Sequence, residues 1–366
     1  MITPNCLQMS RSLRVTGLVP AAVLAAILMM AGPAVAATIT VTDCANDPNI
    51  VVQGGTDSTR IEVAPDDLVI ECALAPLGST DSLVLEAANI RIQGPAGRLF
   101  ADGSGKAIRV TATGMFEALG TVIESTNANS AVDIVTGGDI LFDGTNVVVG
   151  GTGSGGDKLL ITCTDSSPDC TITALASTFK SRELDMIAVG DIVLSGVTIT
   201  TNSPRDRVEI VSLNGNVEAG ANATLPQQPP NNKCGGGGTN PVRTPNRIFG
   251  GPESDLLIQA FGFVDLSGSQ ITVAQNIFVM SGVGGGVASV PAFIDLTGAA
   301  IRNDIGKRGE IEMTADENVD DIRVDTVVLI DDDDSASTND VSELNGCEVV
   351  PRGGCPNIIG TPTTDS

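Results

Sequence analysis

The chain has 366 residues, a formal net charge of −24, and no histidine, tryptophan or tyrosine. Without histidine, the sequence excludes Ser-His-Asp and Cys-His nucleophilic sites and all histidine metal sites. The excess of acidic residues disfavours nucleic acid and anionic lipid as partners, and we expect neither.

The N-terminus has the pattern of a secretory signal peptide. Two arginines precede an apolar run over residues 15–30, and Ala34-Val35-Ala36 supplies the small-x-small pattern that a signal peptidase recognises. We expect cleavage before Ala37, which makes 1–36 the signal peptide and leaves no integral membrane segment in the mature chain. A transmembrane anchor is the alternative, but the apolar run is short and prolines flank or interrupt it.

A short phrase, apolar-x-apolar-x-small-x-x-apolar, then returns every 22 to 30 residues with one double interval. Clear copies occupy 140–147, 192–199 and 264–271, and in a poorer copy Cys170 and Ala174 take the first apolar and the small position. Alternating residues point to opposite faces of a strand, so each copy reads as a strand, a turn and a second strand. One such coil cannot bury its apolar face alone, and stacked copies can.

We therefore predict an all-β fold, a single-stranded parallel β-helix (β-solenoid) of about ten coils. We expect three short strands per coil and a right-handed helix. The predicted domain covers 37–346, with a Pro/Gly-rich insert at 225–252, and 347–366 form a C-terminal cap and tail. An antiparallel sandwich or propeller is the alternative, but Asn-Gly hairpin signals are sparse.

Seven cysteines follow the signal peptide, which fits an oxidising compartment. Three local pairs suggest themselves: Cys44 with Cys72, Cys163 with Cys170, and Cys347 with Cys355. The first would staple the N-terminal edge of the stack and the third its C-terminal end, although proximity alone does not prove connectivity. Cys234 is left over, as a free or a dimer-forming thiol.

Two segments outside the repeats are candidates for binding. The first is an acidic run, Asp331, Asp332, Asp333 and Asp334, whose carboxylate oxygens suit calcium; we expect no other cofactor. The alternative, which we favour, is that this run is a solvated loop that covers the end of the stack. The insert at 225–252 carries Lys233, Arg243 and Arg247, which could meet an anionic polymer such as a uronate, or be an excursion without a partner.

Carboxylates within the repeats are the third candidate. Asp139, Asp143, Asp191, Asp265 and Asp295 are expected to face outward, where stacked coils could pair some of them as glycoside hydrolysis requires. Asp139 and Asp191 stand just before a strand, where Asp commonly bonds its own backbone, so we favour a structural role for them.

The copy at 190–199 resembles the coils of the pectate-lyase-like right-handed β-helix superfamily, and also the repeats of filamentous-haemagglutinin-type and autotransporter proteins. The resemblance spans most of 38–330 and is architectural. For pectate lyases it implies aspartate-bound calcium and a catalytic arginine. For polygalacturonases it implies Asn-Thr-Asp, Asp-Asp and Gly-His-Gly motifs, of which the last needs the missing histidine. No catalytic residue is carried over.

These observations favour an exported acidic β-solenoid that acts as a surface, matrix or adhesion protein without catalysis. Tryptophan and tyrosine, on which sugar rings usually stack, are absent. We expect a secreted, periplasmic or cell-surface location, with polysaccharide or cell-surface components as partners. The alternative is a polysaccharide lyase or hydrolase that uses Asp, Glu, Arg and calcium.

Overall fold

The computed structural model describes most of the repeat region. The described residues are 37–48, 51–53, 58–76, 82–102, 105–150, 157–163, 170–201, 206–220, 245–283, 293–296, 298–303, 311–314, 321–323, 328–331, 344–345 and 357–359. The chain divides into two units, Met1–Ala37 and Thr38–Ser366, and every described strand belongs to the second. Within these described ranges no helix is long and apolar enough to span a membrane.

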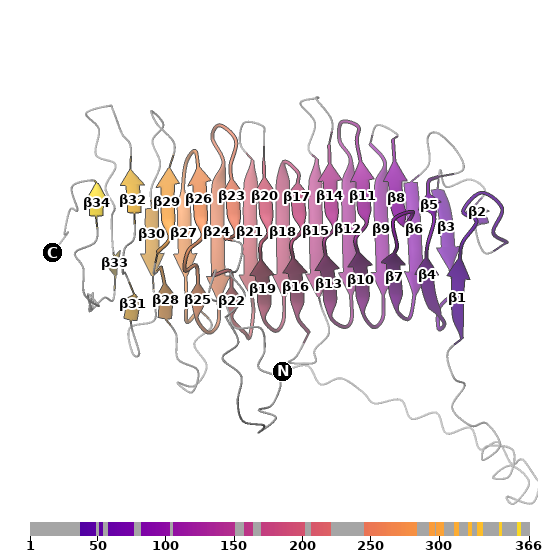
Figure 1. Cartoon of the computed structure of the whole chain (residues 1–366), viewed down its shortest axis with the longest axis horizontal. Helices are drawn as coiled ribbons and strands as arrows, with labels where there is room; N and C mark the ends of the chain where they lie inside the picture. The colour runs from indigo at the N-terminus through magenta and orange to yellow at the C-terminus, as the bar shows by residue number, and fades with distance from the viewer. Residues whose placement is uncertain are drawn as a thin grey trace, which may run out of the picture. The chain divides into compact units, whose positions relative to one another are not determined.

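Three sheets of stacked strands build the second unit (Figure 1). Sheet A contains, in stacking order, β1 (Thr38–Val41), β4 (Asp67–Ile70), β7 (Ile90–Gln93), β10 (Phe116–Leu119), β13 (Ile140–Asp143), β16 (Ile172–Leu175), β19 (Ile192–Ser195), β22 (Val217–Glu218), β25 (Val264–Asp265), β28 (Phe293–Asp295) and β31 (Asp321–Arg323).

Sheet B contains β2 (Val51–Gln53), β3 (Ser58–Glu62), β6 (Ser82–Ala87), β9 (Ala107–Ala112), β12 (Ala131–Thr136), β15 (Lys158–Cys163), β18 (Glu183–Ala188), β21 (Arg207–Ser212), β24 (Asp255–Ala260), β27 (Ile277–Met280), β30 (Ile311–Thr314) and β33 (Leu344–Asn345). Sheet C contains β5 (Ala73–Leu74), β8 (Arg98–Ala101), β11 (Val122–Ser125), β14 (Asn146–Val149), β17 (Thr178–Lys180), β20 (Thr198–Thr200), β23 (Arg247–Phe249), β26 (Gln270–Val273), β29 (Ala300–Asn303), β32 (Val328–Asp331) and β34 (Asn357–Ile359).

The chain visits the sheets in the order A, C, B and then begins the next coil. Each of the strands from β3 to β30 therefore pairs in parallel with the strand three places further along the chain, and only the β2–β3 pair, among the described strands, is antiparallel. Ten complete coils result. The predicted all-β parallel β-helix of about ten coils is confirmed.

The register places equivalent residues of successive coils above one another. In sheet B, Leu159 lies beside Leu184, and both face the interior. Three interior phenylalanines, Phe116, Phe142 and Phe179, contact each other edge to face, with ring centroids 5.8 and 5.2 Å apart. Parallel stacking of this kind buries one continuous apolar core that no single coil could form.

A single residue in the left-handed conformation makes the turn from sheet A to sheet C. In most coils it is glycine, as at Gly144 with φ +61°, because glycine has no Cβ to clash there. In the coil that begins with β16 it is Ala176, with φ +46°. The position predicted for that coil, Ala174, is wrong: Ala174 is buried within β16, whose register pairs Ile140 with Ile172 rather than with Cys170.

The long insert interrupts the same turn between β22 and β23. Residues 221–244 lie outside the described part of the chain. The predicted boundary at 252 is wrong, because Arg247–Phe249 is strand β23 and pairs with β20 and β26. Arg247 therefore belongs to the stack and not to the insert.

Two disulfides join neighbouring parts of the stack. Cys44, which follows β1, is bonded to Cys72, which follows β4, with Cα atoms 5.8 Å apart. Cys163 ends β15 and is bonded to Cys170 ahead of β16, with Cα atoms 6.0 Å apart. They are two of the three predicted pairs; Cys347, Cys355 and Cys234 lie outside the described residues.

Candidate functional site

Apolar side chains fill the interior of the coils, so a site for binding or chemistry has to use turns and outward positions. Of the predicted calcium ligands, Asp331 ends strand β32, and Asp332, Asp333 and Asp334 lie outside the described residues. Lys233 and Arg243 of the insert also lie outside them. No group of three or more acidic or cysteine side chains within the described ranges could hold a metal ion.

Asp139 and Asp191 both stand at the turn from sheet B to sheet A. The Oδ1 atom of Asp139 accepts hydrogen bonds from the backbone N–H of Thr171 at 2.9 Å and from its hydroxyl at 3.0 Å. Asp191 accepts equivalent bonds from Asn216. The sequence prediction of a structural role agrees with these contacts, but the predicted partner is wrong: each carboxylate bonds the next coil and not its own backbone.

The outward carboxylates of sheet A are not gathered in one place. Asp143 is exposed at the end of β13. Further along the stack Glu218, Asp265 and Asp295 occupy successive positions of one row, which the parallel register brings side by side. Asp265 also accepts a hydrogen bond from the backbone N–H of Ser267 at 2.8 Å, so its carboxylate helps to form the following turn. We call Glu218, Asp265 and Asp295 the acidic row.

Sheet B carries rows of alternating charge on its outer face. Lys158 lies in register with Glu183, and its Nζ atom is 3.0 Å from Glu183 Oε1 and 2.5 Å from Asp185 Oδ2. The hydrogen bond to Asp185 is the main cause that raises the pKa of Lys158. Asp185 is only 7% exposed, so this cation neutralises a carboxylate that is largely removed from water.

Asp133 lies on the outer face of the preceding strand of sheet B, β12, beside Arg109 of β9. Its pKa is raised because burial disfavours the charged carboxylate, while Arg109 and Lys158 act in the opposite direction. In its row Asp133 lies between Arg109 and Leu160, so neither neighbour in the row offers it a second carboxylate.

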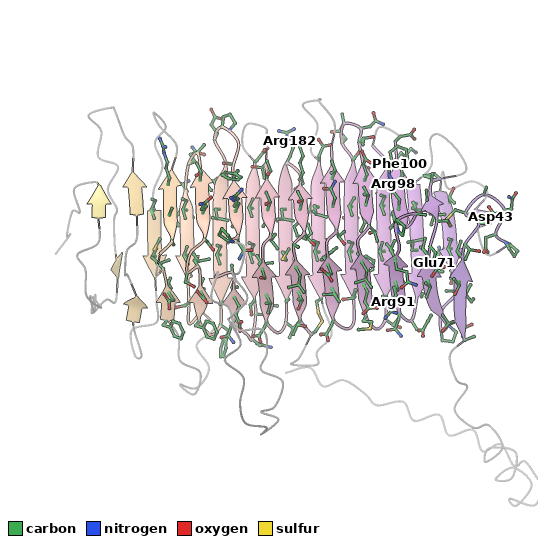
Figure 2. The ribbon with its side chains drawn as sticks, in the orientation of Figure 1. Asp43, Glu71, Arg91, Arg98, Phe100 and Arg182 are labelled. Carbon is green, nitrogen blue, oxygen red and sulfur yellow. A yellow bond between two sulfur atoms is a disulfide. The ribbon has the colours of Figure 1, made fainter. Side chains whose placement is uncertain are left out.

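A shallow hollow lies on the outer face of the first coils of sheet A, lined by Thr38, Asp67, Leu68, Val69, Asn89, Ile90, Arg91, Met115 and Glu117. Its polar groups bond one another. Asn89 donates to Asp67 at 2.7 Å and accepts from the N–H of Met115 at 2.8 Å, and Arg91 is paired with Glu117. Figure 2 labels Arg91 and also Glu71, which follows β4 and accepts a hydrogen bond from the side chain of Gln93 at 2.7 Å. These contacts join successive coils.

Sheet C differs from the other two sheets in its outer face. From β14 to β29 the outward positions hold Asn146, Val148, Thr178, Lys180, Thr198, Thr200, Arg247, Phe249, Gln270, Thr272, Ala300 and Arg302. This set, which we call the sheet C face, contains three cations and no carboxylate in a chain of net charge −24. Nearer the N-terminus, Arg98 lies over Phe100, 4.9 Å from the ring centroid, and is paired with Glu124 (Figure 2).

The sequence prediction missed the sheet C face. In the sequence, this face is formed by the two residues on either side of the inward residue that follows each turn. An example is Thr198-Ile199-Thr200, in which Ile199 is buried and the two threonines face outward. The pair becomes visible once the turn residue of each coil is known, because the strand of sheet C begins two residues after it at Gly196 and at Ala176. No protein-family model, curated protein or solved structure matches this chain.

Proposed function

We propose that the chain is an exported, acidic β-solenoid that serves as a structural or adhesive component of a cell surface or matrix, without catalytic activity. The observation that carries this proposal is the use of its carboxylates as connectors between coils. Asp139 and Asp191 bond the turn of the next coil, and Asp185 is held by Lys158. These three carboxylates are engaged in holding the stack together.

The carboxylate with a raised pKa supports the same proposal. Hydrolysis of a glycoside uses two carboxyl groups that face a common substrate, one of them protonated at working pH. Asp133 has a raised pKa, but its neighbours in the row are Arg109 and Leu160. With Arg109 beside it and no second carboxylate in its row, Asp133 is better suited to balance the charge of that arginine than to act in an acid–nucleophile pair.

Cell fractionation and turnover assays test the proposal together. We expect the protein in the secreted, periplasmic or surface fraction, with Ala37 as its first residue by N-terminal sequencing. We expect the purified protein to release no reducing or unsaturated ends from a panel of acidic and neutral polysaccharides, with and without calcium. Turnover that a single Asp or Arg substitution abolishes, in a variant with unchanged melting temperature, would contradict the absence of catalysis.

Calcium binding at Asp331, Asp332, Asp333 and Asp334 stays a prediction of the sequence. A ligand that binds only the folded chain raises its melting temperature. An unchanged melting temperature in calcium and in chelator would argue against a stabilising site there.

A further inference from the structure

The sheet C face is open to solvent along much of its length. Thr178, Lys180, Arg247 and Gln270 are exposed, and the ring of Phe249 belongs to a residue that is 38% exposed. The surface is a row of short strands with hydroxyl, amide and cationic groups. A cationic surface on a strongly acidic molecule is suited to an acidic partner, because complementary charge guides and orients association.

The acidic row of sheet A provides the complement on the same molecule. Glu218, Asp265 and Asp295 are contributed by β22, β25 and β28, and the next strands along the chain are β23, β26 and β29 of sheet C. Each acid of the row therefore belongs to the same coil as one strand of the sheet C face.

Spacing along the stack matches as well as charge. Strands of one sheet lie about 4.8 Å apart, so positions two coils apart are separated by roughly 9.6 Å. Glu218 and Asp295 are two coils apart in one row of sheet A. Arg247 and Arg302 are also two coils apart in sheet C, but Arg302 lies in the neighbouring outward row, two residues further along the strand. Two copies that lie side by side, with parallel axes and coils level, would bring each arginine to the level of one acid, and the length of the arginine side chains would span the offset between their two rows.

Between those two pairs, Gln270 and Thr272 stand level with Asp265. Their amide and hydroxyl groups are hydrogen-bond donors suited to a carboxylate. Charged side chains of the sheet C face and of the acidic row also make contacts within their own chain. These contacts do not prevent docking, because exposed ion pairs are individually weak and exchange partners easily.

We propose that the sheet C face docks onto the acidic row of a second copy of this chain. The contact joins two different surfaces, so each copy keeps one free face of each kind and the association continues to further copies unless it closes into a ring. This inference rests on the proposed structural function and adds the means by which copies would assemble laterally. A free uronic-acid polymer offers the same charge, but the acidic row offers it on a rigid support with the coil-to-coil spacing of the sheet C face.

Charge reversal on each face provides the test. One variant, Arg247→Glu/Arg302→Glu, makes the sheet C face acidic, and the other, Glu218→Lys/Asp295→Lys, makes the acidic row basic. Sedimentation velocity of the purified full chain, over a range of concentrations, measures association. We expect the wild-type mass to rise with concentration, and each variant alone to need at least about tenfold more protein to associate.

Mixing the two variants gives the decisive result. In an equimolar mixture every contact between unlike variants pairs an acidic with a basic face, so we expect association to return to the wild-type level. The variant Arg109→Glu/Arg207→Glu makes the same change of net charge as Arg247→Glu/Arg302→Glu, but on sheet B, and should associate like the wild type. Circular dichroism and melting curves show that each variant is folded.

Three outcomes would overturn the docking. They are a wild-type chain that stays monomeric at all concentrations, a mixture that fails to recover, and a sheet B control that loses association as fully as the other variants. A monomeric chain that binds polygalacturonate through Arg247 would assign the face to a polysaccharide instead. None of these results affects the proposed structural function, which fails only if the chain shows turnover or is not exported.

Discussion

The Oδ1 atom of Asp191 holds the turn of the following coil by two hydrogen bonds to Asn216, from the backbone N–H at 2.7 Å and from the side-chain amide at 3.1 Å. Asn216 repeats the contact one coil further on, where its Oδ1 atom accepts the N–H of Phe263 at 3.0 Å. The turns from sheet B to sheet A are thus linked by a chain of side-chain bonds that runs along the stack.

Replacement of Asp191 by alanine is expected to destabilise the fold. The change leaves the N–H and the amide of Asn216 without their acceptor, at a cost of about 1–3 kcal/mol. Asp191→Asn keeps the Oδ1 acceptor and serves as the matched control, which should retain most of the stability. Urea unfolding at neutral pH measures both, and equal losses in the two variants would show that the charge, rather than the hydrogen bonds, matters.

Asn246 is the interior counterpart of this contact, and it is 2% exposed. Its side chain accepts the N–H of Val197 at 2.8 Å and donates to the carbonyls of Leu194 at 2.9 Å and Ala219. Asn246→Leu removes all three bonds and buries the backbone groups unpaired, so we expect a loss of roughly 3 kcal/mol or more. Denaturant unfolding checks this, with Gln270→Leu on the exposed sheet C face as a control that should change little.

Lys158 and Asp185 are expected to depend on each other and on pH. Lys158→Met leaves the largely buried Asp185 carboxylate without its cation and should cost about 3 kcal/mol. Lys158→Met/Asp185→Leu should regain much of that loss, because neither charge remains buried. Chemical unfolding of the wild type and both variants measures this coupling. A double variant with a lower free energy of unfolding than the single variant would contradict it.

Because the pKa of Lys158 is raised in the folded state, this pair also predicts a pH dependence. Its contribution should be complete below the ordinary lysine pKa and should be lost as the pH rises through the higher folded value. Melting temperatures between pH 8 and pH 11 should therefore fall more steeply for the wild type than for the double variant.

The bond between Cys44 and Cys72 should stabilise the N-terminal edge of the stack. It closes a loop over a sequence separation of 28 residues, for which chain entropy gives about 3–4 kcal/mol. We expect Cys44→Ser/Cys72→Ser to lower the melting temperature under oxidising conditions. Adding reductant should then lower the melting temperature of this variant less than that of the wild type, because one bond is already missing. Limited proteolysis should then begin near β1, and cleavage that starts elsewhere would contradict an edge-capping role.

Ala176 occupies a turn position where most coils have glycine, and its φ of +46° is unfavourable for a residue with a Cβ. Ala176→Gly should therefore stabilise the fold, by up to about 1 kcal/mol after the greater freedom of glycine in the unfolded chain is subtracted. Gly144→Ala makes the reverse change at the equivalent turn and should destabilise by a similar amount. Thermal unfolding of the two variants measures both changes. Opposite shifts of the melting temperature support the backbone explanation, and a loss in both variants would indicate an effect of local packing instead.

The repeat phrase was sufficient for the fold class, because alternation and turn spacing are local properties of the chain. Ile192 and Leu194 predict an inward face by period alone, and the glycine after Ser195 predicts the bend. The same local evidence failed in the copy around Ala174 and at the end of the insert. There the position of a strand depends on pairing with a neighbouring coil, as between Ile140 and Ile172 or between β20 and β23.

The relationships between outward residues were decided by tertiary structure alone. Asp191 and Asn216 are 25 residues apart, and the sequence offers no means of choosing Asn216 as partner over the aspartate's own turn. Likewise Arg247 and Arg302 come to share one face with Thr200 and Thr272 only when the coils stack in register. The sequence by itself determined which residues most coils bury, and the register between coils decided which of the remaining side chains meet, because that register is a contact between distant segments.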